Sequence, residues 1–395
     1  MSNLRRVGLI ASAAALVALA VATAASARPG AVTSASASQA IACGKTVSIG
    51  MMAPITGPAA SIGDDQLHWA QFYVTIWNNH HKKRGIKLNL VQGDTQLDPS
   101  KGSTVAQQFA SNSKIMGVIG PASSSVVEAV APILKKAGLA FASGSATRVS
   151  LTDGSLRGFF FRDVPNDGVQ GPTDANYMMS DLGVKSGDSV MIVDDQESYS
   201  TGLADIVGAS LKAKGVKVDR ESVSQKATDF SSLVAKVTGS TKVVFLPFQL
   251  ASQAQLFAQQ MKALGKSAPV FGSDGTFDSS TFNVPGPYVS FFAPDVTTIA
   301  ADRGLVKSYH LKYPGGTTPF GAPNFVLAQM YAAAIVKSCK DGKISRAEVR
   351  KNLAAVSLKR TILGQPIAFD KNGDVAGAAF HIFKIQSDGS YKTVK

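Results

Sequence analysis

Histidine is scarce in this sequence, and the five histidines present do not have the spacing of a metal site. The sequence has no His-Glu-x-x-His motif, no Walker phosphate loop and no dinucleotide-binding glycine fingerprint. The Gly-x-Ser-x-Gly elbow of serine hydrolases is also absent. These absences leave an enzyme, a metal site and a bound cofactor without support, and we expect none of them.

Long apolar runs are absent after residue 27. Two arginines precede apolar residues 7–22, and a small-residue cleavage site, Ala-Ser-Ala, stands at 25–27. This arrangement predicts a secretory signal peptide over residues 1–27, because the apolar run is short for a membrane anchor. Residues 28–43 are rich in alanine and serine and are expected to form a flexible spacer. We therefore expect an exported protein, either periplasmic or at the cell surface.

Cysteine occurs only twice, at Cys43 and Cys339. A small scaffold held together by many disulfides is therefore excluded. Two cysteines in an exported chain favour one disulfide between them, and we expect that pairing.

Charged residues make up only 17% of the chain, yet the formal net charge is +13. The basic residues are scattered, which argues against a nucleic-acid partner. The net charge predicts weak attraction to acidic ligands or anionic surfaces. With 395 residues, the chain is long enough for two domains with separate cores.

Short buried strands alternate with amphipathic helices along most of the chain. A first set of strands is predicted at residues 46–52, 86–92, 115–119 and 139–142. A second set is predicted at residues 189–194, 216–222, 242–246, 270–272 and 288–292. Such alternation is typical of parallel sheets with right-handed crossovers. We therefore predict an α/β protein with two doubly wound domains.

Three serines, Ser123 to Ser125, stand where a buried strand ends and a helix begins. Backbone N–H groups at a helix start have no partner within the helix and carry partial positive charge. With the serine hydroxyls they form a site suited to a carboxylate or phosphate, at the edge where doubly wound sheets bind ligands. The other interpretation is that one serine only caps the helix.

Short motifs follow one another in a distinctive order through the chain. They are Ile49-Gly50 with Pro54-Ile55-Thr56-Gly57-Pro58, Gly120-Pro121-Ala122-Ser123-Ser124-Ser125, Ser145-Ala146-Thr147, Phe161-Arg162-Asp163 with Asp167 and Gln170-Gly171-Pro172, and Asp194 to Gly202. In order and spacing, over residues 46–395, they resemble the branched-chain amino acid-binding proteins of ABC importers, which are type I periplasmic binding proteins.

The resemblance implies two Rossmann-like lobes joined by a three-strand hinge. Lobe one would comprise residues 44–164 plus 297–361, and lobe two residues 165–296 plus 362–395. It also implies ligand-binding residues in the cleft between the lobes: Ile62, Ser124, Ser145, Thr147, Tyr199, Phe248 and Asp274.

In that family the residues matching Ser124, Ser145 and Thr147 hold the ligand carboxylate, and an acid matching Asp274 holds the ammonium group. Tyr199 would line the cleft from lobe two. Taken singly, Thr147 and Asp274 also suit caps or turns, and aromatic residues at the other positions suit a core.

The sequence departs from the family pattern at two of these positions. Ile62 replaces a tyrosine near the cleft of the leucine binder, and Asp274 replaces a longer glutamate. The ligand therefore stays open between an amino acid and a related aromatic acid, amide or urea.

We expect a monomeric, non-enzymatic solute-binding protein that delivers a small carboxylate-bearing ligand to a membrane permease. Binding would proceed by closure of the hinge. Two alternatives remain: a ligand-sensing protein of the same fold, and a secreted hydrolase, which would convert an amide or ester that a binder returns unchanged.

Overall fold

The computed structural model describes residues 41–42, 46–81, 85–314, 318–339, 342–377 and 379–395. The expected signal peptide, nearly all of the spacer, and Cys43 lie outside these residues. Signal cleavage and the Cys43–Cys339 disulfide therefore stay predictions. No helix in the described part of the chain combines the length and apolar character needed to cross a membrane.

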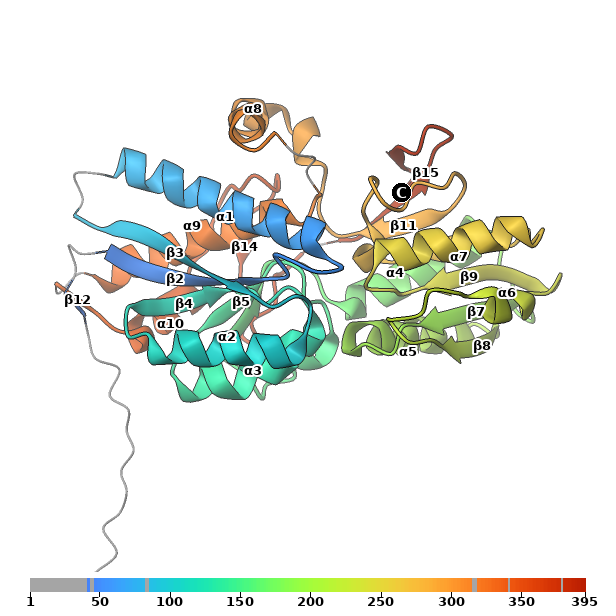
Figure 1. Ribbon diagram of the computed structural model, residues 1–395, viewed down its shortest axis with the longest axis horizontal. Coiled ribbons are helices and arrows are strands. Elements are labelled where there is room, and N and C mark those ends of the chain that lie inside the picture. The colour runs from blue at the N-terminus through green and yellow to red at the C-terminus, as the bar shows by residue number, and fades with distance from the viewer. Residues whose placement is uncertain (1–40, 43–45, 82–84, 315–317, 340–341, 378) are drawn as a thin grey trace, which may run out of the picture. The chain divides into compact units, whose positions relative to one another are not determined.

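The first sheet consists of five parallel strands in the order β3-β2-β4-β5-β6. Its strands are β2 (Thr46–Ala53), β3 (Lys87–Asp94), β4 (Ile115–Ile119), β5 (Phe141–Ser143) and β6 (Phe160–Arg162). Helices cover both faces (Figure 1): α1 (Ala60–His80) and α9 (Gly321–Ser338) on one, α2 (Pro99–Ser111) and α3 (Ser124–Lys136) on the other. Helix α10 (Arg346–Ala354) packs on α9 and β4.

The second sheet has the order β16-β15-β11-β10-β9-β7-β8. Its strands are β7 (Ser189–Asp194), β8 (Lys217–Ser222), β9 (Thr241–Leu246), β10 (Val270–Gly272), β11 (Tyr288–Phe291), β15 (His381–Ile385) and β16 (Tyr391–Thr393). Strands β7 to β11 run parallel, whereas β15 and β16 join one edge antiparallel. The flanking helices are α4 (Asp167–Ser180), α5 (Ser198–Lys212), α6 (Ser231–Ala235) and α7 (Ala251–Ala263). This confirms the predicted α/β fold with two doubly wound lobes.

Successive side chains of the central strands point to opposite faces of each sheet. In β2, Val47 and Ile49 face the α1/α9 side, whereas Met52 joins the α2/α3 side. In β7, Val190 faces α4 and α5, and the next residue, Met191, joins the core on the opposite face. Both faces of each strand are apolar because helices cover both faces of a parallel sheet.

Several small elements were not predicted. The two-residue strands β1 (Ile41–Ala42) and β12 (Lys343–Ile344) pair with each other, and β13 (Ser357–Leu358) pairs with β14 (Ile367–Ala368). Strand β14 falls within the strand that the sequence predicts at residues 367–369, whereas β1, β12 and β13 are too short to show a period. The sequence also predicts a helix over residues 230–238, but the helix that forms, α6, has only five residues. Helix α8 (Arg303–Lys312), which precedes α9, agrees with the helix that the sequence predicts over residues 303–313.

The chain passes between the two sheets after β6, after β11 and before β15. Arg162, the last residue of β6, is fully buried and pairs through Nε with Asp374 at 2.5 Å. Its Nη1 donates to the carbonyl of Ala146 at 3.1 Å. Asp374 belongs to the segment that leads to β15, so this ion pair fixes one passage to another.

We expect Arg162→Met to lower the free energy of unfolding by about 3 kcal/mol or more, because removing one partner of a buried ion pair leaves the other uncompensated. Urea unfolding followed by circular dichroism measures the loss. Arg157→Met is the matched control, because Arg157 is exposed and its guanidinium donates to Asn372, two residues before Asp374. Equal stability of the two variants would contradict the assignment.

Candidate functional site

A small cavity lies where the carboxyl ends of strands from both sheets meet. Residues that follow β2, β4 and β5 form one wall, and residues that follow β7, β9 and β10 form the other. The lining comprises Pro54, Ala59, Ile62, Leu97, Ala122, Ser123, Ser124, Ser145, Tyr199, Gln249, Asp274 and Phe320. This is the edge at which doubly wound sheets bind ligands.

The serine loop forms the first wall, and one of its serines caps helix α3 as the sequence suggested. Ser123 is the N-cap of α3, and its hydroxyl accepts from the N–H of Val126 at 3.4 Å. Ser124, the first residue of the helix, lines the cavity, and its hydroxyl accepts from the N–H of Arg148 at 3.3 Å. At Gly120 the backbone has φ +95°, and a Cβ would lie 2.1 Å from the carbonyl oxygen of Met52. Only glycine therefore allows the loop to turn here.

Ser145 extends the same wall from the loop after β5. Its hydroxyl donates to the carbonyl of Ala122 and accepts from Nε2 of Gln66, both at 2.8 Å. Gln66 comes from α1 and is almost fully buried. These two bonds fix the orientation of Ser145, and sequence reasoning missed the contribution of Gln66.

Asp274 forms the centre of the opposite wall. It stands two residues after the end of β10 and is only 2% exposed. Tyr199, from the first turn of α5, donates its hydroxyl to Asp274 Oδ1 at 2.5 Å. Burial raises the pKa of the Asp274 carboxyl to about 6, and the side chains of Tyr199 and Gln170 oppose that rise. At neutral pH the carboxyl is therefore mostly ionised and gives this wall a negative charge.

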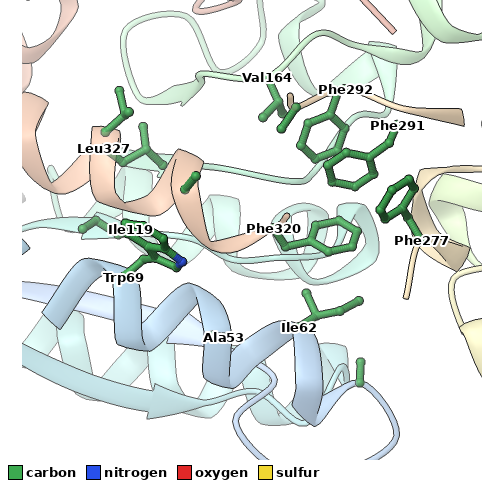
Figure 2. Close-up of a cluster of buried hydrophobic side chains, with 14 of the residues drawn as sticks. Ala53, Ile62, Trp69, Ile119, Val164, Phe277, Phe291, Phe292, Phe320 and Leu327 are labelled. Atoms are coloured by element: carbon green, nitrogen blue, oxygen red, sulfur yellow. The ribbon is translucent and has the colours of Figure 1, made fainter. Parts of the chain in front are cut away.

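The polar end of the cavity is bounded by an apolar group. Figure 2 shows Phe320 between Ile62 and the rings of Phe291 and Phe292. The ring centroids of Phe320 and Phe291 are 4.9 Å apart, and those of Phe320 and Phe292 are 5.8 Å apart. Phe292 directly follows β11, where the chain passes between the sheets. Phe320 thus links the cavity to a passage between the lobes, and no pattern around it in the sequence indicated this role.

The space left in the cavity is about 10 Å³, the room of a single water molecule. Polar contacts join the two walls nearby: Ser61 donates to Asp278 at 3.1 Å, and Ser198 donates to Glu128 at 2.7 Å. Arg148 also donates to the Ser198 carbonyl. These contacts are partly exposed, and each contributes little to stability. A ligand larger than water therefore requires the walls to separate.

The structure places five of the seven expected residues on the cavity: Ile62, Ser124, Ser145, Tyr199 and Asp274. Phe248 lies instead in the core of the second lobe, with ring centroids 5.9 Å from Phe230 and 6.4 Å from Phe257. Thr147 is fully buried behind the lining. Its hydroxyl makes no hydrogen bond of ordinary geometry to described residues, although it lies close enough to Asp167 to lower that pKa.

The arrangement is suited to binding. One wall offers hydroxyl and helix N-terminal donors, and the other offers a buried carboxylate. Within the described ranges, no set of three or more His, Cys, Asp or Glu side chains is arranged to hold a metal ion.

A profile of the periplasmic binding protein family matches residues 46–390. The chain belongs to this family. It is 27% identical over 352 residues to the Leu/Ile/Val-binding protein homolog 3 of Brucella melitensis, which covers 86% of this chain and 91% of that protein. Identity to the Leu/Ile/Val-binding protein of Escherichia coli is 25% over 363 residues, covering 90% and 95%.

The fold also matches solved structures of the family. LivJ from Streptococcus pneumoniae, in complex with isoleucine, has a TM-score of 0.77 at 24% identity and covers 89% of this chain and 100% of that chain. A solute-binding protein of R. palustris in complex with benzoate has a TM-score of 0.77 at 18% identity, covering 89% and 96%. The resemblance stated from the motifs is confirmed, and so is the expectation that the chain is not an enzyme, since these relatives are binding proteins.

Tyr199→Phe should raise the pKa of Asp274 above its value of about 6, because the hydroxyl stabilises the ionised carboxylate. A hydrogen bond to a charged group is worth roughly 1.5–3 kcal/mol, or about one to two pH units. Carbon-13 NMR titration of labelled aspartate side chains measures the shift. Tyr177→Phe is the control, because this buried tyrosine of α4 does not bond to Asp274. A midpoint unchanged by Tyr199→Phe would contradict the assignment.

Proposed function

We propose that this protein is the exported solute-binding component of an ABC importer and that it binds an α-amino acid between its two lobes. The carrying observation is the opposite chemistry of the cavity walls. Hydroxyl and helix N-terminal donors face a buried carboxylate, which is the arrangement that an α-carboxylate and an α-ammonium group require. The relatives named as Leu/Ile/Val-binding proteins support the same ligand class.

The carboxylate end of the ligand would bind at the start of α3. Ser124 supplies a hydroxyl proton, and the first turn of the helix supplies unpaired N–H groups and the positive end of the helix dipole. Ser145 is held in place by Gln66 and Ala122, which keeps the wall in a fixed shape. Thr147 stands behind it as a further donor that becomes available if the loop after β5 shifts.

The ammonium end would bind at Asp274. This carboxylate already accepts from Tyr199, and no Lys or Arg side chain of the described residues donates to it. A buried anion without a cationic partner costs several kcal/mol, so a ligand that brings a positive charge removes that cost. Benzoate, the ligand of one structural neighbour, would bring a second negative charge instead.

The ligand side chain would contact Ile62, Leu97 and Phe320. Because the present space holds only one water, the ligand enters when the lobes separate and is enclosed when they return. Phe320 packs against Phe292 at a passage between the lobes, so a ligand that contacts its ring also supports the closed arrangement.

We propose residues 44–164 plus 297–361 and 165–296 plus 362–395 as the two closing units. The protein would act as a monomer, export would be directed by residues 1–27, and a membrane permease would be its partner.

Ser124→Ala should weaken leucine binding about tenfold or more, because a hydrogen bond to a charged group is worth roughly 1.5–3 kcal/mol. Isothermal titration calorimetry at neutral pH measures the affinity. Ser125→Ala is the matched control, since Ser125 is the next residue of the same helix and does not line the cavity. If both variants bind leucine equally well, the serine loop only caps α3.

Asp274→Asn should weaken leucine binding by at least about tenfold, because the ammonium group loses its opposite charge. The affinity for 4-methylpentanoate, which is leucine without its amino group, should change little or increase. Calorimetry with both ligands on both proteins makes the comparison. An equal loss for both ligands would show that Asp274 has a structural role, and the amino acid assignment would then lose its main support.

A further inference from the structure

A stripe of buried polar side chains runs along one face of α4. Asp167, Gln170 and Asp174 are spaced three and four residues apart, which places them on the same side of the helix. All three are fully buried. Carboxylates are almost never fully buried unless they are paired, so two on one helix face require an explanation.

This stripe faces the second wall of the cavity. Gln170 Nε2 donates to Ser290 of β11 at 3.0 Å, and Ser290 Oγ donates to Asp174 at 3.1 Å. The Gln170 side chain also lies close enough to Asp274 to lower its pKa. Among the described residues, both Asp167 oxygens and Oδ1 of Asp174 have no hydrogen-bond partner. The buried carboxyl groups of Asp167 and Asp174 therefore lie behind the cavity wall to which Asp274 belongs.

Burial and mutual repulsion disfavour the ionised forms of Asp167 and Asp174. Burial and then the charge of Asp274 raise the pKa of Asp167 to about 7. Burial raises the pKa of Asp174 well above its usual value; the hydrogen bond from Ser290 opposes this, and the charges of Asp274 and Asp167 add to it.

The cations that face the region are Arg162 and Arg148, and both lower the pKa of Asp167. Arg162 is already paired with Asp374, and Arg148 is paired with Glu128 at 3.3 Å. The remaining ionisable neighbour, Tyr199, is neutral, because burial raises its pKa well above the usual value. Neither arginine donates a hydrogen bond to any of the three carboxyl groups within the described part of the chain.

We propose that Asp167 and Asp174, which do not line the cavity, act with Asp274 as one carboxyl cluster that selects a ligand bearing a cationic amino group and releases a proton to solvent when that group binds. The proposal rests on the proposed function, because it assigns the charge of the ligand that the cavity takes. Asp167 and Asp174 are thus positioning residues that act through Asp274.

The direction of the pH dependence follows from competition between a proton and the ammonium group. A proton on the cluster removes the negative charge that the ammonium group needs, so amino acid affinity falls as pH falls. With a pKa of about 6 at Asp274, leucine should bind about tenfold more weakly at pH 5 than at pH 8. Coupled carboxyl groups lose their protons in shared steps, so the change should extend toward pH 7.

The first experiment needs no ligand. Carbon-13 NMR of labelled aspartate side chains follows the titration of the empty protein and of Asp274→Asn. We expect the substitution to lower the midpoints of Asp167 and Asp174 and to leave that of Asp163 unchanged. Asp163 is a control within the same molecule, because it is fully buried and its pKa is raised by burial without a contribution from these charges. Midpoints that do not respond would overturn the cluster.

The second experiment counts protons during binding. Calorimetry of leucine at pH 6.5, in two buffers with different ionisation enthalpies, should show release of a fraction of a proton. Asp167→Asn should reduce that fraction, and Asp163→Asn should not; 4-methylpentanoate should release none. Leucine binding without proton release would overturn the inference and leave the proposed function intact. Tighter binding of 4-methylpentanoate than of leucine would overturn both.

Discussion

The carboxyl ends of parallel strands lie at one edge of their sheet, and this constraint determines where the protein can place polar groups. Each loop that follows a strand begins at the same edge as its neighbours. Ser124 and Ser145 therefore converge although β4 and β5 are separated in sequence by a helix. Tyr199 and Asp274 converge in the second lobe for the same reason. Gly120 and Gly275 allow neighbouring loops to approach one another closely at this edge. A Cβ at residue 275, for example, would lie 2.5 Å from the Phe248 carbonyl oxygen.

Electrostatics gives the convergence its chemical character. The cations nearest the second wall already have anionic partners, since Arg162 pairs with Asp374 and Arg148 pairs with Glu128. The carboxyl groups behind the cavity are left without a positive partner among the described residues. Burial disfavours their ionised forms and raises their pKa values. The proposed ligand would bring the positive charge that these carboxyl groups do not receive from the described residues.

Aromatic packing connects the cavity to a passage of the chain between the two sheets. The aromatic group of Phe291, Phe292 and Phe320 lies between the cavity and a passage of the chain from one sheet to the other. Packed cores do not deform continuously, so under the proposed function a ligand in contact with the Phe320 ring would favour one arrangement of the lobes. The polar contacts that close the walls are few and partly exposed, which keeps the energetic cost of opening small.

The sequence by itself determined the architecture, because strand and helix periods are local properties of the chain. The apolar run at residues 189–194 coincides with β7, and Gly272-Ser273-Asp274 stands at the end of β10 as expected. The serine loop was also recognisable, although the assignment of Ser123 as the cap and of Ser124 as the first helical residue needed the helix start to be known.

Only the tertiary structure decided which side chains reach the cavity. Phe248 and Gln249 are adjacent, yet Phe248 points into the core and Gln249 lines the cavity, because loop dihedral angles set these directions. Gln66 comes from α1 and Phe320 directly precedes α9, and both are far in sequence from the loops that they contact, so no local pattern could place them beside the site. The role of the buried carboxyl groups of α4 also depends on the tertiary structure. Their spacing is visible in the sequence, but their effect depends on Asp274, which lies about a hundred residues away and is brought near only when the sheet forms.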